Sequence, residues 1–422
     1  MTYADIILPL PLEGYFTYCV PDTMAPRLQP GCRVRVPLGK AKTYTGLVAA
    51  LHDQVPAGLK TGKEGVKSIV EMMDPGPVLL PQQLRLWQWI ADYYLSPIGD
   101  VYKAALPSGL KAEDDYRPKT ETYVVLADDF RSAQALRAAQ AMLQRAPAQQ
   151  KVLRAYLELA SVSEENPVPQ REITREELMN EAHCTTTVLR QFLDRRILRQ
   201  YEKEVGRIPL GGMPHPEHIK PLSEAQADAY NQILVQQMSK DITLLHGVTS
   251  SGKTEIYIHL IQRALDEGRQ VLYLLPEIAL TVQMMQRLRR VFGDRLGIYH
   301  SRYSDAERVE IWKRQLSDHP YDVILGARSA LFLPFQRLGL VIVDEEHEQS
   351  FKQMDPAPRY HARSAAIILA KFCGAKVLLG TATPSSESYW NAQTGKYGYV
   401  RLDKRYQDMA LPAVEVVDVK DL

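Results

Sequence analysis

A glycine-rich octapeptide at residues 247–254 constrains this chain more than any other feature. It reads Gly-Val-Thr-Ser-Ser-Gly-Lys-Thr, a complete G-x-x-x-x-G-K-S/T phosphate loop. Residues 242–245 before it predict a buried strand, and residues 255–265 after it carry apolar side chains at helical spacing. Since a strand, a tight turn and a helix follow one another, bound phosphates would lie at a helix N-terminus. A glycine-serine turn that fits the pattern by chance is disfavoured by this context.

The residue types of the loop predict how it would hold ATP and Mg²⁺. Gly247 and Gly252 allow a tight turn that aims backbone N–H groups at phosphate oxygens. Lys253 can reach the β- and γ-phosphates, and the Thr254 hydroxyl can ligate Mg²⁺. With an upstream glutamine placed to hydrogen-bond the adenine, the predicted nucleotide-binding residues are Gln226, Gly247, Val248, Thr249, Ser250, Ser251, Gly252, Lys253 and Thr254.

A second motif, Asp-Glu-Glu-His at residues 344–347, follows an apolar run at 340–343. The run fits a central parallel strand that is buried on both faces. Asp344 at its end is expected to hold Mg²⁺ through water, and Glu345 to polarise the attacking water. Lys253, Asp344 and Glu345 are therefore the predicted catalytic residues, and Thr254 and Asp344 the predicted Mg²⁺ ligands. Glu346 and His347 are expected to couple the site to neighbouring motifs. The competing interpretation is a strand end with solvated acids.

The composition limits which partners and which cellular location are expected for this chain. The 422 residues are 45% hydrophobic and 24% charged, and the net charge is +1, so a nucleic-acid site would have to be a local basic patch. The four cysteines are far apart and form no C-x-x-C pair, which predicts neither a disulfide framework nor a zinc site. The N-terminus lacks a basic leader, and no apolar run approaches membrane-spanning length. A cytoplasmic protein without membrane contact is expected.

Three blocks and a linker are expected along the chain. Residues 1–107 contain short strand-like runs and one helix at 82–94. Residues 120–205 contain helices at 149–159, 175–182 and 185–196 followed by a strand at 198–205, the pattern of a winged helix; a plain helical packing module fits these residues nearly as well. Residues 206–221, rich in Pro, Gly and His, are predicted to be a linker. Residues 222–422 alternate strands and helices, which predicts a doubly wound parallel α/β domain.

Three further segments, at residues 222–226, 275–281 and 380–384, distinguish a helicase from other phosphate-loop proteins. Leu-Pro-Glu-Ile-Ala-Leu-Thr at 275–281 follows one expected strand, and Gly-Thr-Ala-Thr-Pro at 380–384 follows another. Their order resembles the first motor lobe of a superfamily 2 helicase, a P-loop (RecA-like) parallel-sheet lobe. The Asp-Glu-Glu-His box and residues 350–363 narrow the resemblance to the PriA family of bacterial primosomal proteins, over the whole chain.

The resemblance implies two sets of DNA contacts. In that family a β-rich N-terminal domain binds the 3′ end of a DNA leading strand, and Phe16, Thr17, Tyr18, Gly39 and Lys67 fall where its pocket lies. Core packing is the competing interpretation of Phe16 and Tyr18. Residues 350–363 resemble an aromatic-rich loop that links DNA occupancy to hydrolysis. There Phe351, Tyr360 and His361 would stack on bases, and Lys352 and Arg359 would meet phosphates.

The resemblance also implies an activity and its partners. The family's proteins are ATP-dependent 3′→5′ DNA helicases that act on stalled forks and D-loops with single-stranded DNA-binding protein and other primosome proteins. The family continues with a zinc module and a second motor lobe carrying an arginine finger. Zinc is therefore expected only beyond Leu422, and the chain is expected to be a fragment that hydrolyses ATP poorly. Two alternatives are a fork-binding platform with a nucleotide-sensing lobe and a translocase that is not a helicase.

Overall fold

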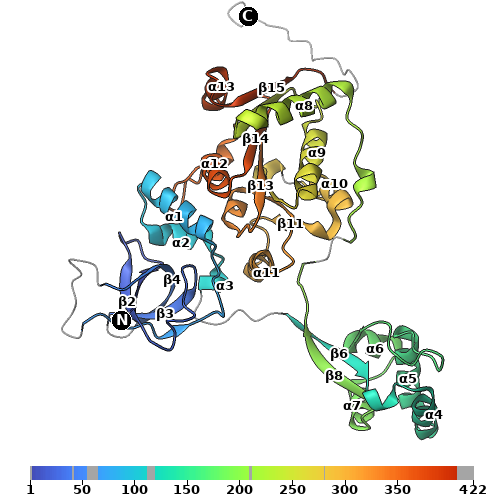
Figure 1. The fold of residues 1–422 in the computed structure, drawn as a ribbon. Coiled ribbons are helices and arrows are strands. Elements are labelled where there is room, and N and C mark those ends of the chain that lie inside the picture. Colours follow the sequence, from blue (N-terminus) through green and yellow to red (C-terminus); the bar gives the residue numbers. More distant parts are fainter. Residues whose placement is uncertain are drawn as a thin grey trace, which may run out of the picture. The chain divides into compact units, whose positions relative to one another are not determined.

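The computed structural model describes residues 2–39, 42–54, 65–111, 119–208, 212–279 and 281–405. The chain divides into two compact units, one of residues 1–116 and 209–422 and one of residues 117–208 (Figure 1). The expected winged-helix block, 120–205, lies inside the second unit. The expected blocks 1–107 and 222–422 lie together in the first.

An antiparallel sheet and three short helices make up the N-terminal part of the first unit. In strand β3, Val34 and Val36 are buried in the core and Arg35 is partly exposed, but Arg33 is also buried, where it forms an ion pair with Asp74, so the strand follows the alternation of a half-exposed strand only in part. The sheet order is β2-β1-β4-β3-β5. The elements are β1 (Thr2–Ile7), β2 (Phe16–Val20), β3 (Arg33–Leu38), β4 (Lys42–His52), β5 (Glu71–Met72), α1 (Pro81–Tyr93), α2 (Ile98–Ala105) and α3 (Ser108–Lys111).

A seven-stranded parallel sheet forms the C-terminal part of the first unit, as the sequence predicts. Its order is β11-β12-β10-β13-β14-β9-β15, so the strand after the phosphate loop's helix, β10, lies beside the acidic strand β13. Helices α9 and α10 join one face of the sheet in a single buried apolar cluster. The strands are β9 (Ile242–Gly247), β10 (Gln270–Leu274), β11 (Leu296–Tyr299), β12 (Val323–Gly326), β13 (Leu338–Asp344), β14 (Lys376–Thr381) and β15 (Gly398–Leu402). The helices are α8 (Glu224–Ser239), α9 (Lys253–Asp266), α10 (Val282–Phe292), α11 (Asp305–Leu316), α12 (Ala362–Cys373) and α13 (Ser386–Gln393).

Buried hydrogen bonds join the N-terminal sheet and helices to the parallel-sheet lobe. The indole Nε1 of Trp312 donates to the carbonyl of Val78 at 2.8 Å, and Nε2 of Gln83 donates to the carbonyl of Phe332 at 2.6 Å. Both donor side chains are fully buried. Because a buried polar group without a partner is costly, these bonds favour one arrangement of the two parts within the unit.

The expected linker, 206–221, is only partly a connector. Its described C-terminal part contains a short 3₁₀ helix, Pro216–His218, and packs on α10. There the amide of His215 donates to the carbonyl of Val291 at 2.8 Å. Proline-rich composition therefore indicated the absence of a long helix but not the docking of the segment.

The second unit has its own core and the winged-helix elements. The three expected helices are present as α5 (Pro147–Leu159), α6 (Arg175–Glu181) and α7 (Thr186–Asp194), and α4 (Ala133–Met142) precedes them. The expected wing strand is β8 (Leu198–Glu204), which pairs antiparallel with β6 (Thr120–Leu126); β7 (Ile173–Thr174) completes the sheet. Buried apolar residues from all four helices form one cluster, which is sufficient to define a separate unit.

Candidate active site

The phosphate loop connects β9 to the start of α9, where the sequence predicts it. Ser250 and Gly252 have positive φ angles of 62° and 78°. A Cβ at Gly252 would lie 2.2 Å from Nε2 of Gln226, so only glycine fits there. The backbone thus curls over the N-terminus of α9, where unpaired N–H groups and the helix dipole favour a phosphate.

Gln226 supports this loop from α8. Its Nε2 donates to the carbonyl of Ser251 at 3.1 Å, and its Oε1 accepts from the amide of Ser223 at 2.9 Å in a capping box. The side chain is buried. Both of these hydrogen bonds join the amide to main chain of this protein, and the adenine contact of Gln226 stays a prediction.

A cavity of about 440 Å³ opens over the loop. Sequence reasoning missed two of its cationic side chains, Lys220 and Arg287, because both lie outside the motifs; Arg287 is held by an ion pair with Glu255. Of the predicted nucleotide-binding residues, Gln226, Gly247, Val248 and Thr249 are not among those that line it. The lining residues are Lys220, Ser250, Ser251, Gly252, Lys253, Thr254, Glu255, Arg287, Asp344 and Glu345.

Two polar groups of the loop are arranged so that a phosphate could bind. The Lys253 ammonium donates to the carbonyl of Gly247 at 3.1 Å, a bond that a phosphate oxygen can replace. The Ser251 hydroxyl is buried and makes no hydrogen bond. Since an unpartnered buried hydroxyl is costly, a ligand that can pair with it is favoured at this position.

Two buried tyrosines hold the carboxylate of Asp344. The Tyr257 hydroxyl, from α9, donates to Oδ1 at 2.9 Å, and the Tyr273 hydroxyl, from β10, donates to Oδ2 at 3.2 Å. Burial, then the nearby Glu345, raises the pKa of Asp344 to about 6. Burial also raises the pKa of both phenols well above the usual value, so they remain donors. A Cβ at Gly380 would lie 1.8 Å from the Tyr257 hydroxyl oxygen, which explains a glycine in that motif.

The residues predicted to bind Mg²⁺ fit that ion. Thr254 and Asp344 both line the cavity, one at the start of α9 and one at the end of β13. Phosphate-bound Mg²⁺ needs few protein ligands, typically a hydroxyl and a carboxylate, and completes its shell with water and phosphate oxygens. Within the described ranges no group of three or more His, Cys, Asp or Glu side chains could hold a metal ion by itself.

Glu346 links the acidic motif to neighbouring segments, as predicted. It is fully buried and forms an ion pair with Arg363 at the start of α12. Its Oε1 accepts from the amide of Ser385 at 2.7 Å, and its Oε2 accepts from the hydroxyls of Ser385 at 3.0 Å and Ser388 at 2.8 Å. Four donors around one buried carboxylate make it a structural junction rather than a group facing the cavity.

His347 makes the second predicted link. Its Nδ1 lies 2.7 Å from the hydroxyl oxygen of Thr381, at the end of β14, and its Nε2 lies 3.4 Å from that of Thr383. The acidic motif and the Gly-Thr-Ala-Thr-Pro segment therefore touch through side chains as well as through the adjacent strands β13 and β14.

The predicted DNA-end residues lie on and beside β2. Tyr18 is buried in the core of the sheet, its hydroxyl donates to the carbonyl of Pro37 at 3.1 Å, and burial raises its pKa to about 12. Its ring therefore presents no face for base stacking in this structure, and core packing is the correct interpretation of its ring. Phe16 is only partly buried. The Thr17 hydroxyl donates to Oδ1 of Asp5 at 2.7 Å.

Lys67 and Gly39, far apart in the sequence, are neighbours. The Lys67 ammonium donates to the Gly39 carbonyl, and Gly39 has a φ of 68° with open space around its Cα. The carbonyl of Lys67 accepts from the amide of Cys19 at 2.8 Å, which brings the lysine to the end of β2. The structure thus brings Lys67 and Gly39 together beside β2.

The predicted base-stacking residues of the aromatic-rich loop are largely inaccessible. Phe351 and Tyr360 are each 1% exposed, and the Tyr360 ring packs against that of Phe332 with centroids 5.2 Å apart. In this structure neither ring can stack on a base, because apolar packing has taken both into the core. Base stacking by these two residues would require the loop to rearrange.

The polar residues of the loop are closer to the surface. Lys352 and His361 form a β-bridge, the Lys352 ammonium donates to the carbonyl of Arg359, and the Arg359 side chain is exposed. Burial, then the cations Arg363 and Lys352, lowers the pKa of His361 to about 4, so its ring is neutral at physiological pH. The backbone amide of His361 donates to the hydroxyl of Tyr94, after α1, at 3.1 Å.

Three protein-family models match successive segments of the chain. The PriA 3′ DNA-binding domain matches residues 5–107, the PriA helicase winged-helix domain of Bacteroidota matches residues 121–205, and the DEAD/DEAH box helicase domain matches residues 223–390. Within the described residues no helix is long and apolar enough to cross a membrane.

Relatives align along the whole chain. The replication restart protein PriA of Haemophilus influenzae is 33% identical over 100% of this chain and 54% of its own length. That of Bacillus subtilis is 31% identical over 100% of this chain and 58% of its own. This chain therefore spans just over half the length of these relatives. Among solved structures, DUF1998 helicase MrfA bound to DNA aligns over 48% of this chain and 30% of its own, at 18% identity and a TM-score of 0.32, which supports no further argument.

Proposed function

This chain belongs to the PriA family of replication restart proteins, and on that premise we propose that it is the DNA-recognising and ATP-binding part of an ATP-dependent 3′→5′ DNA helicase. One observation carries the proposal. Lys253 and Thr254 at the start of α9 line the same cavity as Asp344 and Glu345 at the end of β13. This is the arrangement that ATP hydrolysis requires.

Each residue of the cavity has its own proposed role in ATP hydrolysis. The loop N–H groups and Lys253 bind the phosphates, while Thr254 and Asp344 hold Mg²⁺. Held by Thr254 and Asp344, Mg²⁺ would supply positive charge that offsets the negative charge of the phosphates. Glu345, whose φ of 49° sets it apart from the strand, orients the attacking water. Tyr257 and Tyr273 fix the Asp344 carboxylate.

The proposed DNA substrate is a stalled fork or a D-loop with a free leading-strand 3′ end. Phe16, Thr17, Gly39 and Lys67 are proposed to contact that end, with Tyr18 supporting them from the core. Lys352, Arg359 and His361 are proposed to contact DNA through the aromatic-rich loop. The primosome proteins and single-stranded DNA-binding protein are proposed partners, and the cytoplasm is the proposed location.

Strand displacement tests the proposal. A labelled fork with a free leading-strand 3′ end should be unwound by the full-length protein with ATP, and Lys253→Ala should abolish unwinding while fork binding remains. If the full-length protein binds the fork but does not displace a strand when ATP is added, the result would instead support a fork-binding platform with a nucleotide-sensing lobe. Failure to bind any fork would overturn both.

A further inference from the structure

One face of α1 carries a row of aromatic and cationic side chains. Arg85, Trp89 and Tyr93 are four residues apart and so lie on the same side of the helix. The Trp89 and Tyr93 rings stack with centroids 4.8 Å apart and an interplanar angle of 18°. The Arg85 guanidinium lies 4.3 Å from the ring centroid of Phe372 in α12. We call Arg85, Trp89, Tyr93 and Tyr94 the aromatic ridge.

The ridge continues into the aromatic-rich loop. The ring centroids of Tyr93 and Tyr94 are 5.0 Å apart, and the Lys352 ammonium lies 5.0 Å from the centroid of Tyr94. The Tyr94 hydroxyl accepts from the amide of His361 at 3.1 Å. Rings and cations from the N-terminal helices and from the parallel-sheet lobe thus form one continuous surface, next to residues proposed to contact DNA.

Tyr93 is the accessible ring of this surface. It is 64% exposed, whereas Trp89 and Tyr94 are each partly covered by their neighbours. A ring that stacks on tryptophan and remains open to solvent can accept a further planar group. Arg85 lies at one end of the ridge, and Lys352 lies next to its other end. A ligand in which negatively charged groups alternate with planar rings would therefore fit this surface.

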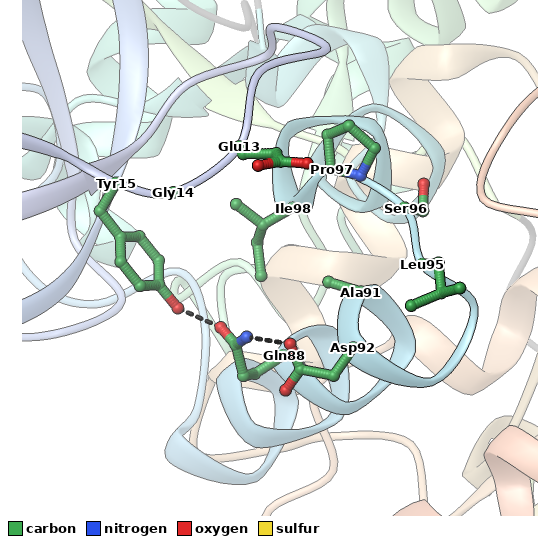
Figure 2. Close-up of a pocket in the computed structure, with 10 residues that line it drawn as sticks. All are labelled: Glu13, Gly14, Tyr15, Gln88, Ala91, Asp92, Leu95, Ser96, Pro97 and Ile98. Carbon is green, nitrogen blue, oxygen red and sulfur yellow. Dashed lines mark hydrogen bonds between the residues drawn. The ribbon is translucent and has the colours of Figure 1, made fainter.

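The neighbouring face of α1 has the opposite character. Figure 2 shows Gln88 and Asp92 there, with Nε2 of Gln88 donating to Oδ1 of Asp92 at 2.7 Å and the Tyr15 hydroxyl bonded to Gln88. A cavity of about 420 Å³ lies beside them, lined by the carboxylates of Glu13 and Asp92. Because carboxylates repel phosphate, a nucleic acid would follow the ridge rather than this cavity.

We propose that the aromatic ridge binds single-stranded DNA, with one base stacked on Tyr93, a neighbouring phosphate directed to Lys352, and a phosphate further along the strand directed to Arg85. The site is separate from the predicted DNA-end residues on β2. It deepens the proposed function, because it rests on DNA as the ligand. Stacking tolerates any base, so the ridge discriminates single strands from duplexes rather than one sequence from another.

Fluorescence anisotropy with a labelled oligothymidylate tests the ridge in the full chain. Tyr93→Ala should weaken binding about fivefold to a hundredfold, the range for loss of one stacked base. Tyr93→Phe, which keeps the ring, should bind like the parent chain. Trp390→Ala is the matched control, since Trp390 is an exposed ring on α13, 69% accessible. Lys352→Gln should lower the slope of log affinity against log salt by about one.

The outcomes distinguish failure of the proposed DNA function from failure of the ridge alone. A parent chain that binds no oligonucleotide would overturn the proposed DNA function and the ridge together. A parent chain that binds, with Tyr93→Ala equal to it, would overturn the ridge alone and point to another partner for this surface. Equal melting temperatures of Tyr93→Ala and Tyr93→Phe would establish that a loss of binding does not arise from unfolding.

Discussion

Replacing Tyr273 by Phe removes one of the two hydroxyls that hold Asp344 and leaves the rest of the site in place. The lost bond is the 3.2 Å contact between the Tyr273 hydroxyl and Oδ2. The ring itself packs edge to face against Tyr257, with centroids 5.6 Å apart, and phenylalanine preserves that packing. The substitution therefore changes the hydrogen bonding of a buried carboxylate with little change in volume.

The magnitude follows from the charge of the acceptor. A hydrogen bond to a charged group contributes about 1.5–3 kcal/mol, and the length of this one places it at the lower end. Binding of Mg²⁺ needs the ionised carboxylate in a fixed orientation, so the loss should appear in Mg²⁺ affinity. Since 1.4 kcal/mol is tenfold, the Mg²⁺ concentration for half-saturation should rise about tenfold.

Titration of Mg²⁺ into the chain with a fluorescent ATP analogue measures this effect through binding rather than turnover. Nucleotide affinity without Mg²⁺ should stay unchanged, because Lys253 and the loop are not altered. Tyr102→Phe is the matched control, since that buried tyrosine also donates its hydroxyl, to the carbonyl of Thr45 at 3.1 Å, but lies in the N-terminal part of the unit. Equal Mg²⁺ half-saturation in Tyr273→Phe and the parent chain would refute the positioning role of the hydroxyl.

Three further predictions distinguish residues by what surrounds them. Glu345→Gln should abolish ATP hydrolysis in the full-length protein with unchanged urea unfolding. Glu346→Ala should lower the unfolding free energy by about 3–5 kcal/mol, because it removes the fully buried carboxylate that pairs with the partly buried Arg363. Phe16→Ala should weaken binding about tenfold only on forks with a free leading-strand 3′ end; a uniform loss on all forks with a large drop in melting temperature would instead identify a core residue. Burial lowers the pKa of His361 to about 4 in the folded chain, whereas in the unfolded chain the imidazole has its usual pKa of about 6.5. Stability should therefore fall as pH drops from about 6.5 to 4, and His361→Gln should flatten that profile in thermal melts.

The sequence predicted the parallel sheet and the phosphate loop because both are encoded locally. The loop needs glycine at a left-handed position followed by lysine and a hydroxyl, and its flanks show strand and helix periodicity within a few residues. The acidic strand was likewise readable as an apolar run ending in acids. In each case the residues that determine the structure are contiguous, so no knowledge of strand order was needed.

The tyrosine pair around Asp344 could not be predicted in the same way. Tyr257 and Tyr273 stand in apolar stretches where any large side chain suits the core. Their hydroxyls meet one carboxylate only because β10 pairs in parallel with β13 and α9 crosses the same face. Strand order in a doubly wound sheet depends on long-range packing, which single-sequence periodicity does not contain.

The burial of aromatic side chains also could not be predicted from the sequence. Phe351, Tyr360 and Tyr18 were predicted to contact DNA, yet their rings are buried, while Tyr93 is the large exposed ring of the ridge. A ring gains free energy by burial and by base stacking alike, so residue type alone does not separate the two uses. Accessibility decides between them. Tyr93, the exposed ring of the ridge, lies at the end of α1 beside Tyr94, whose hydroxyl accepts from the amide of His361. Arg363, two residues further, pairs with Glu346, which follows the predicted catalytic residues Asp344 and Glu345 in the chain. The proposed single-strand site and the cavity over the phosphate loop are thus joined by the hydrogen bond between Tyr94 and the His361 amide, a short stretch of main chain, and the ion pair between Arg363 and Glu346. These connections give the predicted link between DNA occupancy and hydrolysis a physical route.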